Sequence, residues 1–268
     1  MKYIFQVFLD FFPIFLISAV EGLTEFFPVS STAHILVLSH FFKIKLGMEF
    51  VVGVQLGAIL AVFLSYTKYL KVIFSEIITL KPRLSLSLVI ITMPTLIAGF
   101  ALHKLGYLEI FEEKIMQIMG INLFIGGIIM LIFRKKSGTQ SDISQISPLT
   151  SIKIGLIQAI SLVPGVSRSA SVVFGGIFSG LSKSAAMELS FLSGVPIILC
   201  ATVFELWNSY SSGTSVQSPI VLISSMFVSF FFAFIGIQLL KVLVKCGKDF
   251  EFFGIYRIII GVVLFFIM

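Results

Sequence analysis

Charged residues are scarce in this chain of 268 residues, since Asp, Glu, Lys and Arg together make up only 12% of it. A soluble domain carries about 25%, and so few charges cannot cover a water-exposed surface. Hydrophobic residues reach 57%, and the mean hydropathy is +1.09. This composition excludes a disordered chain. It predicts an all-α integral membrane protein, and at about 20 residues a span the length allows roughly six to eight crossings.

Cysteine is also rare, and acidic residues are outnumbered. Cys200 and Cys246 lie in or at the end of apolar runs, which excludes a disulfide framework or a cysteine metal cluster. The 19 basic and 13 acidic residues leave a net charge of +6. The basic residues stand singly or in threes between apolar runs, as membrane topology signals do. The surplus of positive charge therefore does not indicate a nucleic-acid partner.

Six apolar runs predict membrane spans, and two other segments do not fit that template. The six runs cover residues 49–65, 84–103, 115–133, 185–207, 219–240 and 252–268. The two remaining segments, about 11–42 and 150–180, each contain a polar kink with proline between apolar arms of roughly 12–15 residues. Arms of that length are too short to cross, so we expect two re-entrant helical hairpins, shielded by protein or by a water-filled cavity.

The two kinks resemble each other. EGLTEFFPVSSTAH begins at Glu21 and QAISLVPGVSRSAS begins at Gln158, an offset of 137 that also superposes the first three spans on the last three. Each half is thus one hairpin and three spans, residues 1–136 and 148–268, within a single membrane domain. Because three is an odd number, the halves must have opposite orientations. The sequence predicts a 3+3 inverted repeat with its site near the midplane.

Basic residues predict the orientation of this repeat. On the expected topology one side of the membrane receives Lys68, Lys71, Lys81, Arg83, Arg134, Lys135, Lys136, Lys153, Lys183, Lys241, Lys245 and Lys248. The opposite loops hold Glu109, Glu112 and Glu113, with Lys43 and Lys45 as exceptions. By the positive-inside rule the basic side is cytoplasmic. Both termini are then expected outside.

The first kink carries two carboxylates in an apolar setting. Glu21 and Glu25 are four residues apart and share one face of a helix. Carboxylates inside a membrane are costly and mark a functional site by default. Pairing between helices by hydrogen bonds is the plainer alternative. Pro28, three residues after Glu25, is expected to end this first arm.

Hydroxyl groups and a histidine follow the carboxylates. Ser30, Ser31 and Thr32 are candidates for the N-cap of the second arm, and capping alone would explain each of them. His34 lies three residues beyond Ser31, one helical turn along. A hydroxyl and an imidazole at this spacing can be neighbours, which is the minimal pairing for an activated nucleophile.

The second kink, PGVSRS, contains an arginine that cannot lose its proton in a membrane site. Arg168, between Ser167 and Ser169, therefore needs an anion, either a glutamate of the first kink or a phosphate, which a guanidinium binds with two donors at once. Two helix N-termini meeting here would favour anions further. Anion donors, carboxylates, hydroxyls and an imidazole together suit phosphoryl transfer or hydrolysis.

EGLTEFFPVSSTAH and PGVSRS closely resemble the two signature motifs of the bacitracin-resistance type of undecaprenyl-diphosphate phosphatase. FVVGVQLGAILAV at Phe50, LSFLSGVP at Leu189 and YRIIIG at Tyr256 also resemble that family, in the right order along nearly the whole chain. The resemblance implies a hydrolase of the bacterial cytoplasmic membrane that converts undecaprenyl diphosphate to undecaprenyl phosphate and phosphate. This recycles the lipid carrier of peptidoglycan synthesis, and bacitracin competes for the same lipid.

The resemblance further implies the site residues and a cofactor. Glu25, Ser31, His34 and Arg168 are expected to be catalytic. Phosphate is expected to contact Arg168, Ser167, Ser169, Ser30 and Thr32, and Glu21 and Glu25 are expected to hold a divalent cation, Mg²⁺ or Ca²⁺. The active site is expected to open to the outer side of the membrane. A homodimer is compatible with the resemblance, and no nucleic acid is implied.

Two questions stay open at the level of sequence. Ser31 can attack the terminal phosphorus with His34 handling the proton, or His34 can be the nucleophile or the base for water. Glu25 can bind the cation or orient His34. A membrane transporter or flippase of polyprenyl phosphate is the alternative function, since inverted repeats with broken helices are typical of transporters.

Overall fold

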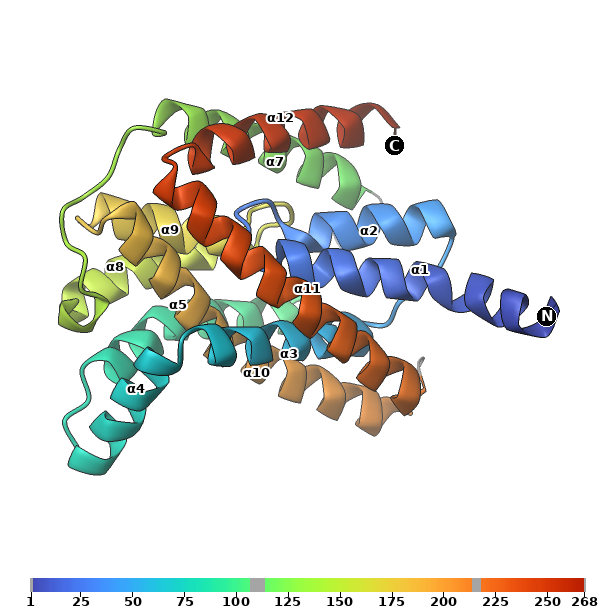
Figure 1. Cartoon of the computed structure of the whole chain (residues 1–268), viewed down its shortest axis with the longest axis horizontal. Helices are drawn as coiled ribbons and strands as arrows, with labels where there is room; N and C mark the ends of the chain where they lie inside the picture. The colour runs from blue at the N-terminus through green and yellow to red at the C-terminus, as the bar shows by residue number, and fades with distance from the viewer. Residues whose placement is uncertain (1, 107–113, 214–217, 268) are drawn as a thin grey trace.

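The chain is all-helical, as its composition predicts. The computed structural model describes residues 2–106, 114–213 and 218–267 (Figure 1). Within these ranges extended structure is limited to one isolated bridge between Gln140 and Leu181. Glu109, Glu112 and Glu113, on which part of the predicted orientation rests, lie outside the described residues.

The helices follow the predicted order in both halves. The first half contains α1 (Lys2–Glu25), α2 (Ser31–Phe42), α3 (Met48–Ser65), α4 (Thr67–Thr79), α5 (Leu84–Lys104) and α7 (Ile115–Ile132). The second half contains α8 (Pro148–Ala159), the short 3-10 helix η3 (Ile160–Leu162), α9 (Arg168–Phe178), α10 (Lys183–Ser212), α11 (Pro219–Lys245) and α12 (Asp249–Ile267). A 3-10 turn, η2 (Ile143–Gln145), lies in the polar linker between the halves.

Within the described residues, five helices are long and apolar enough to cross a membrane, namely α3, α5, α7, α10 and α11. Each coincides with one of the six apolar runs in the sequence, and α12 coincides with the sixth. Large apolar side chains remain exposed along them, for example Ile97, Val203 and Phe227. Such surfaces are stable in lipid and not in water. The chain is therefore an all-α integral membrane protein.

The two kinked segments form helical hairpins. α1 and α2 lie side by side around a turn at residues 26–30, and α8 and α9 pack on each other around a turn at 163–167 (Figure 1). Arms of 11 or 12 residues in α2, α8 and α9 agree with the expected length. The first arm does not, because α1 has 24 residues and continues through Pro13 to Lys2. The expectation of a short first arm was wrong, because the helix begins at Lys2 and not near residue 11.

An additional amphipathic helix, α4, branches from the end of α3 (Figure 1). Sequence reasoning assigned only basic residues to this stretch. α4 presents exposed Phe74 and Ile78 on one side and buries Glu76 against the start of α5. The Glu76 carboxylate accepts hydrogen bonds from the backbone N–H groups of Leu84 and Ser85, both at 2.9 Å, and so satisfies free donors at that helix N-terminus.

Close helix packing surrounds the hairpins. α1 packs on α11, α8 packs on α5, α3 packs on α11, and α7 packs on α12. Glycines make these approaches possible: a Cβ at Gly22 would lie 2.2 Å from the Ser229 carbonyl oxygen, and one at Gly57 would lie 2.0 Å from that of Met226. Small residues at such crossings are the usual means of packing helices in lipid. The hairpin tips are thereby held inside the bundle.

Candidate active site

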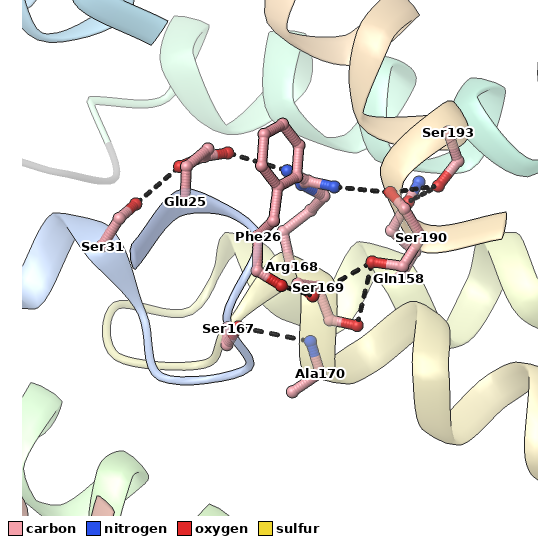
Figure 2. Close-up of polar contacts among 10 residues, drawn as sticks. All are labelled: Glu25, Phe26, Ser31, Gln158, Ser167, Arg168, Ser169, Ala170, Ser190 and Ser193. Atoms are coloured by element: carbon pink, nitrogen blue, oxygen red, sulfur yellow. Dashed lines mark hydrogen bonds and ion pairs between the residues drawn. The ribbon is translucent and has the colours of Figure 1, made fainter. Parts of the chain in front are cut away.

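Glu25 connects the two hairpin tips. Its Oε2 accepts a hydrogen bond from the Ser31 hydroxyl at 2.6 Å, and its Oε1 pairs with Nη2 of Arg168 at 2.7 Å (Figure 2). The side chains of Arg168 and Glu25 are only 14% and 7% exposed. Three residues predicted from the two separate motifs therefore meet at one point.

The first tip has an unusual backbone conformation. Ser30 has φ 66° and ψ 85°, a left-handed conformation that is uncommon for a residue other than glycine, and its side chain makes no cap hydrogen bond. Ser31 begins α2 instead and points its hydroxyl back to Glu25, the last residue of α1. Of the three cap candidates, Ser30 therefore holds the N-cap position, and Ser31 does not serve as a cap. Its hydroxyl is committed to a carboxylate.

The second tip is more regular. Gly165 supplies the turn with φ 85°, and the Ser167 hydroxyl accepts a hydrogen bond from the Ala170 N–H at 3.2 Å as an ordinary N-cap. Ser169 donates to the Phe26 carbonyl oxygen of the first tip at 3.0 Å, and its hydroxyl oxygen accepts a hydrogen bond from Ser190 at 3.0 Å (Figure 2). Ser167 and Ser169 are therefore occupied in building the two tips.

Arg168 begins α9 and is held from two sides. Besides the ion pair with Glu25, its Nη1 donates to the Ser190 carbonyl oxygen of α10 at 2.8 Å. The guanidinium lies against Gly194, where an added Cβ would be 2.4 Å from Nη1. Among the described residues, these are its two hydrogen-bond partners, and a guanidinium has five N–H groups. The remaining donors can bind an anion.

Glu21 is completely buried one turn before Glu25. Neither of its carboxylate oxygens has a hydrogen-bond partner among the residues that the structure describes. Its counterpart in the second half, Gln158, donates from Nε2 to the Ile91 carbonyl oxygen and the Thr95 hydroxyl, and its Oε1 accepts a hydrogen bond from the Ser193 hydroxyl. An orphaned buried carboxylate is costly. Glu21 is thus the side chain of the site that most needs a cation or a proton.

His34 does not pair with Ser31, contrary to expectation. Its Nδ1 lies 2.8 Å from the Ser30 carbonyl oxygen, and its Nε2 lies 2.6 Å from the hydroxyl of Tyr256 on α12. Glu25 therefore does not orient His34 either. Both ring nitrogens of His34 are bonded to other groups, so a separation of one helical turn from Ser31 did not produce a hydrogen bond between the two residues. The side chain of Thr32 is exposed at the start of α2.

Tyr256 and Arg257 also contact the hairpin tips, and sequence reasoning missed this although both belong to the YRIIIG motif. Arg257 is 2% exposed and donates to carbonyl oxygens of both tips, Pro28 at 2.9 Å and Gly165 at 3.3 Å. It also donates to Asn122 and Leu123 of α7. An arginine within an apolar run was the available signal, because such a residue is expensive to bury.

The arrangement brings together the guanidinium of Arg168, the Ser31 hydroxyl bonded to the Glu25 carboxylate, and the buried carboxylate of Glu21. Helices α2 and α9 both begin beside Glu25, and the dipoles at their N-termini add positive potential there. The described residues contain no group of three acidic, histidine or cysteine side chains that could enclose a metal ion. Glu21 and Glu25 could still offer the one or two carboxylates that Mg²⁺ uses together with water and phosphate.

The chain is thus a polytopic membrane protein whose two hairpin tips bring an arginine, a serine and two glutamates together inside the helix bundle. Comparison with known protein families identifies the family to which this chain belongs. The sequence profile of the bacitracin resistance protein BacA family matches residues 14–263, and the chain belongs to this family.

Curated relatives extend over nearly the whole chain. It is 34% identical to an undecaprenyl-diphosphatase of Methanococcus aeolicus, with 96% of this chain and 98% of the relative covered. It is 37% identical to an undecaprenyl-diphosphatase of Persephonella marina, covering 92% and 94%. For one of Caulobacter sp. the identity is 36%, covering 91% and 92%.

Proposed function

We propose that the protein hydrolyses undecaprenyl diphosphate to undecaprenyl phosphate and inorganic phosphate, and so recycles the lipid carrier for cell-wall synthesis. The Glu25 network carries the proposal, because it joins a hydroxyl nucleophile and a phosphate-binding arginine from two different hairpins. The names of the relatives agree with this activity. The flippase alternative is not favoured, since a carrier does not need a serine hydroxyl that is hydrogen-bonded to a carboxylate.

In this mechanism Ser31 is the nucleophile. Its Oγ attacks the terminal phosphorus while its proton passes to Glu25, which already accepts that hydrogen at 2.6 Å. The bridging P–O bond breaks and undecaprenyl phosphate leaves. Arg168 turns its unpartnered N–H groups to the phosphate oxygens, where charge is greatest. Water then attacks the phosphoserine and releases phosphate, with Ser31 regaining a proton.

His34 is the alternative nucleophile, and trapping distinguishes the two. We expect the labelled phosphoryl group of a quenched reaction to map to Ser31. A phosphate on His34 would contradict the serine mechanism, and the absence of any adduct would favour direct attack by water. The hydrogen bond between Tyr256 and Nε2 of His34 supports the serine version, because the lone pair that a histidine nucleophile needs is occupied.

A divalent cation, Mg²⁺ or Ca²⁺, is proposed at Glu21, with Glu25 beside it. The unpartnered buried oxygens of Glu21 and the acidic neighbour suit an oxygen-binding cation. When bound, it would neutralise phosphate charge. We expect chelation to abolish phosphate release and added Mg²⁺ or Ca²⁺ to restore it. Glu21→Gln should weaken the binding of the metal itself, measured by calorimetry without substrate.

The decisive assay measures phosphate release from undecaprenyl diphosphate by the purified protein in detergent. We expect Ser31→Ala, Glu25→Gln and Arg168→Ala each to lower kcat by about 10²-fold or more. Ser39→Ala is the matched control on the same helix, because the Ser39 hydroxyl has no hydrogen-bond partner among the described residues. Wild-type protein without activity in any divalent metal would contradict the proposed function. In cells, extra protein should raise bacitracin tolerance.

The membrane arrangement is proposed as six spans and two re-entrant hairpins in an inverted repeat. Ser31 and Arg168, the first residues of α2 and α9, are 137 residues apart, the offset of the sequence repeat. The packing of α1 on α11 is the counterpart of the packing of α8 on α5. Both observations support the two-fold relation.

We place the protein in the bacterial cytoplasmic membrane, with its basic side inside and its site and termini facing outward. Basic residues from separate segments do gather, since Lys183 Nζ donates to the Arg134 carbonyl oxygen at 2.6 Å. In a variant without Cys200 and Cys246, an impermeant thiol reagent on intact cells should label a cysteine at Ser211 and not one at Lys135. The reverse pattern would invert the topology.

A further inference from the structure

His34 and Tyr256 form a contact that the proposed reaction does not use. Tyr256 lies on α12, 222 residues away in sequence, and its hydroxyl oxygen is 2.6 Å from Nε2 of His34. The two rings are stacked, with 5.7 Å between centroids and 3° between planes. On the other side of the imidazole, Nδ1 is 2.8 Å from the Ser30 carbonyl oxygen.

These partners decide which nitrogen of His34 carries the proton. A carbonyl oxygen can only accept, so Nδ1 must be the N–H that donates to Ser30. In a neutral imidazole the other nitrogen is then an acceptor, and it receives the Tyr256 O–H. Without Tyr256 the ring could rotate, lose the Ser30 hydrogen bond and then change tautomer. Tyr256 opposes this rotation because its hydroxyl holds Nε2.

The helix turn that carries Tyr256 is held firmly against the hairpin tips. The next residue, Arg257, is anchored to carbonyl oxygens of both hairpin tips and of α7, so this turn of α12 cannot move independently of the site. α12 also packs along α7 more extensively than on any other described helix. A residue whose backbone is held in this way can hold its own partner in a defined geometry.

We propose that Tyr256 is a positioning residue, which keeps His34 in the Nδ1–H tautomer with Nε2 directed toward α12. This role rests on the proposed function in one respect, since its effect on kcat can be measured only if the protein is the phosphatase proposed above. It also explains why His34 does not contact Ser31: the tyrosine holds the imidazole away from the hydroxyl, and Glu25 serves Ser31 instead.

The direct test is spectroscopic and independent of activity. The chain has three histidines, so ¹⁵N-histidine labelling gives few ring signals, and His34→Ala identifies those of His34. We expect the wild-type ring to show a protonated Nδ1 and an acceptor Nε2. Tyr256→Phe keeps the ring but removes the hydroxyl, and it should yield a mixture of tautomers. An unchanged tautomer in Tyr256→Phe would overturn the proposal.

Kinetics supply the second readout. We expect Tyr256→Phe to lower kcat about tenfold with KM unchanged, because His34, which is bonded to the residue next to Ser31, loses one of its two hydrogen bonds. Added to His34→Ala, it should cost less than twofold more, because both changes remove the same unit. Tyr69→Phe is the matched control: it also removes a tyrosine hydrogen bond, to Glu188, and should leave kcat unchanged.

The outcomes separate the two proposals. If Tyr256→Phe shifts the tautomer but the wild type releases no phosphate, the positioning role is supported and the proposed function is contradicted. An active wild type with a normal Tyr256→Phe variant would contradict the positioning role alone. Additive losses in the double variant would also contradict it, because they would mean that Tyr256 acts without His34.

Discussion

Gly194→Ala tests whether the position of Arg168 matters apart from its charge. A Cβ at residue 194 would lie 2.4 Å from Nη1 and 2.8 Å from Cζ of Arg168. Because atoms in contact settle about 3.5 Å apart, the guanidinium must retreat by about 1 Å. Its hydrogen bonds to Glu25 at 2.7 Å and to the Ser190 carbonyl oxygen at 2.8 Å would then stretch past the usual limit.

A displacement of about 1 Å at a reacting centre costs about 10²-fold in rate, or ~2.7 kcal/mol of activation free energy. Stability should move in the other direction. Gly194 lies within α10, where alanine is favoured over glycine by ~0.5–1 kcal/mol, and the atoms that must yield are at the end of a flexible side chain. We therefore expect a stable protein with a low kcat/KM.

The assay compares phosphate release and the thermal unfolding midpoint in detergent. Gly99→Ala is the control, since its Cβ would meet only Leu162 at an ordinary 3.4 Å. It should retain wild-type activity. Gly194→Ala in an Arg168→Ala background should cost nothing more, because the displaced group is gone. A Gly194→Ala variant within twofold of wild-type kcat/KM would refute the reasoning.

Three further predictions concern stability, each checked by the thermal unfolding midpoint in detergent. Arg257→Gln should lower the free energy of unfolding by about 3 kcal/mol or more, because buried carbonyl oxygens of both tips lose their donor; an unchanged midpoint would contradict this. Gly165→Ala should cost more than Gly180→Ala: both have positive φ, but only at Gly165 would a Cβ meet backbone, at 2.6 Å, whereas nothing lies within 4 Å at Gly180. Burial raises the pKa of Glu76, but hydrogen bonds from Ser85 and its neighbours outweigh this and hold the pKa below its ordinary value. The carboxylate thus stabilises the fold above the ordinary pKa of about 4.3, and the contribution fades as pH falls through the lowered value. Glu76→Gln should therefore be destabilising at pH ~7, and its effect should shrink as the pH falls below the ordinary pKa.

The predicted fold was correct where hydrophobic patterning decides it. Every expected span coincides with a helix, and the two proline-containing kinks are turns between helices. The errors lie where patterning is weak. α1 begins at Lys2 and not near residue 11, and α4 was not expected, because its apolar face is too short to look like a span. Neither error changed which residues meet at the hairpin tips.

Residue identity determined which groups gather at the site, and tertiary structure determined how they pair. Charges and hydroxyls in apolar segments are costly, so Glu25, Ser31 and Arg168 could be selected from the sequence alone. Which carboxylate Arg168 meets could not, because Glu21 and Glu25 share one helix face and only the approach of α9 separates them.

The partner of His34 shows the same division most clearly. Helical spacing allowed it to contact Ser31, yet a tyrosine 222 residues away holds it, and Ser31 turns back to Glu25. Spacing along one helix gives only proximity, whereas a hydrogen bond also needs direction. The sequence by itself determined the membrane class, the hairpins and the polar set. The crossing of α12 and α9 over the two tips decided direction, and with it the proton partners of Ser31 and His34.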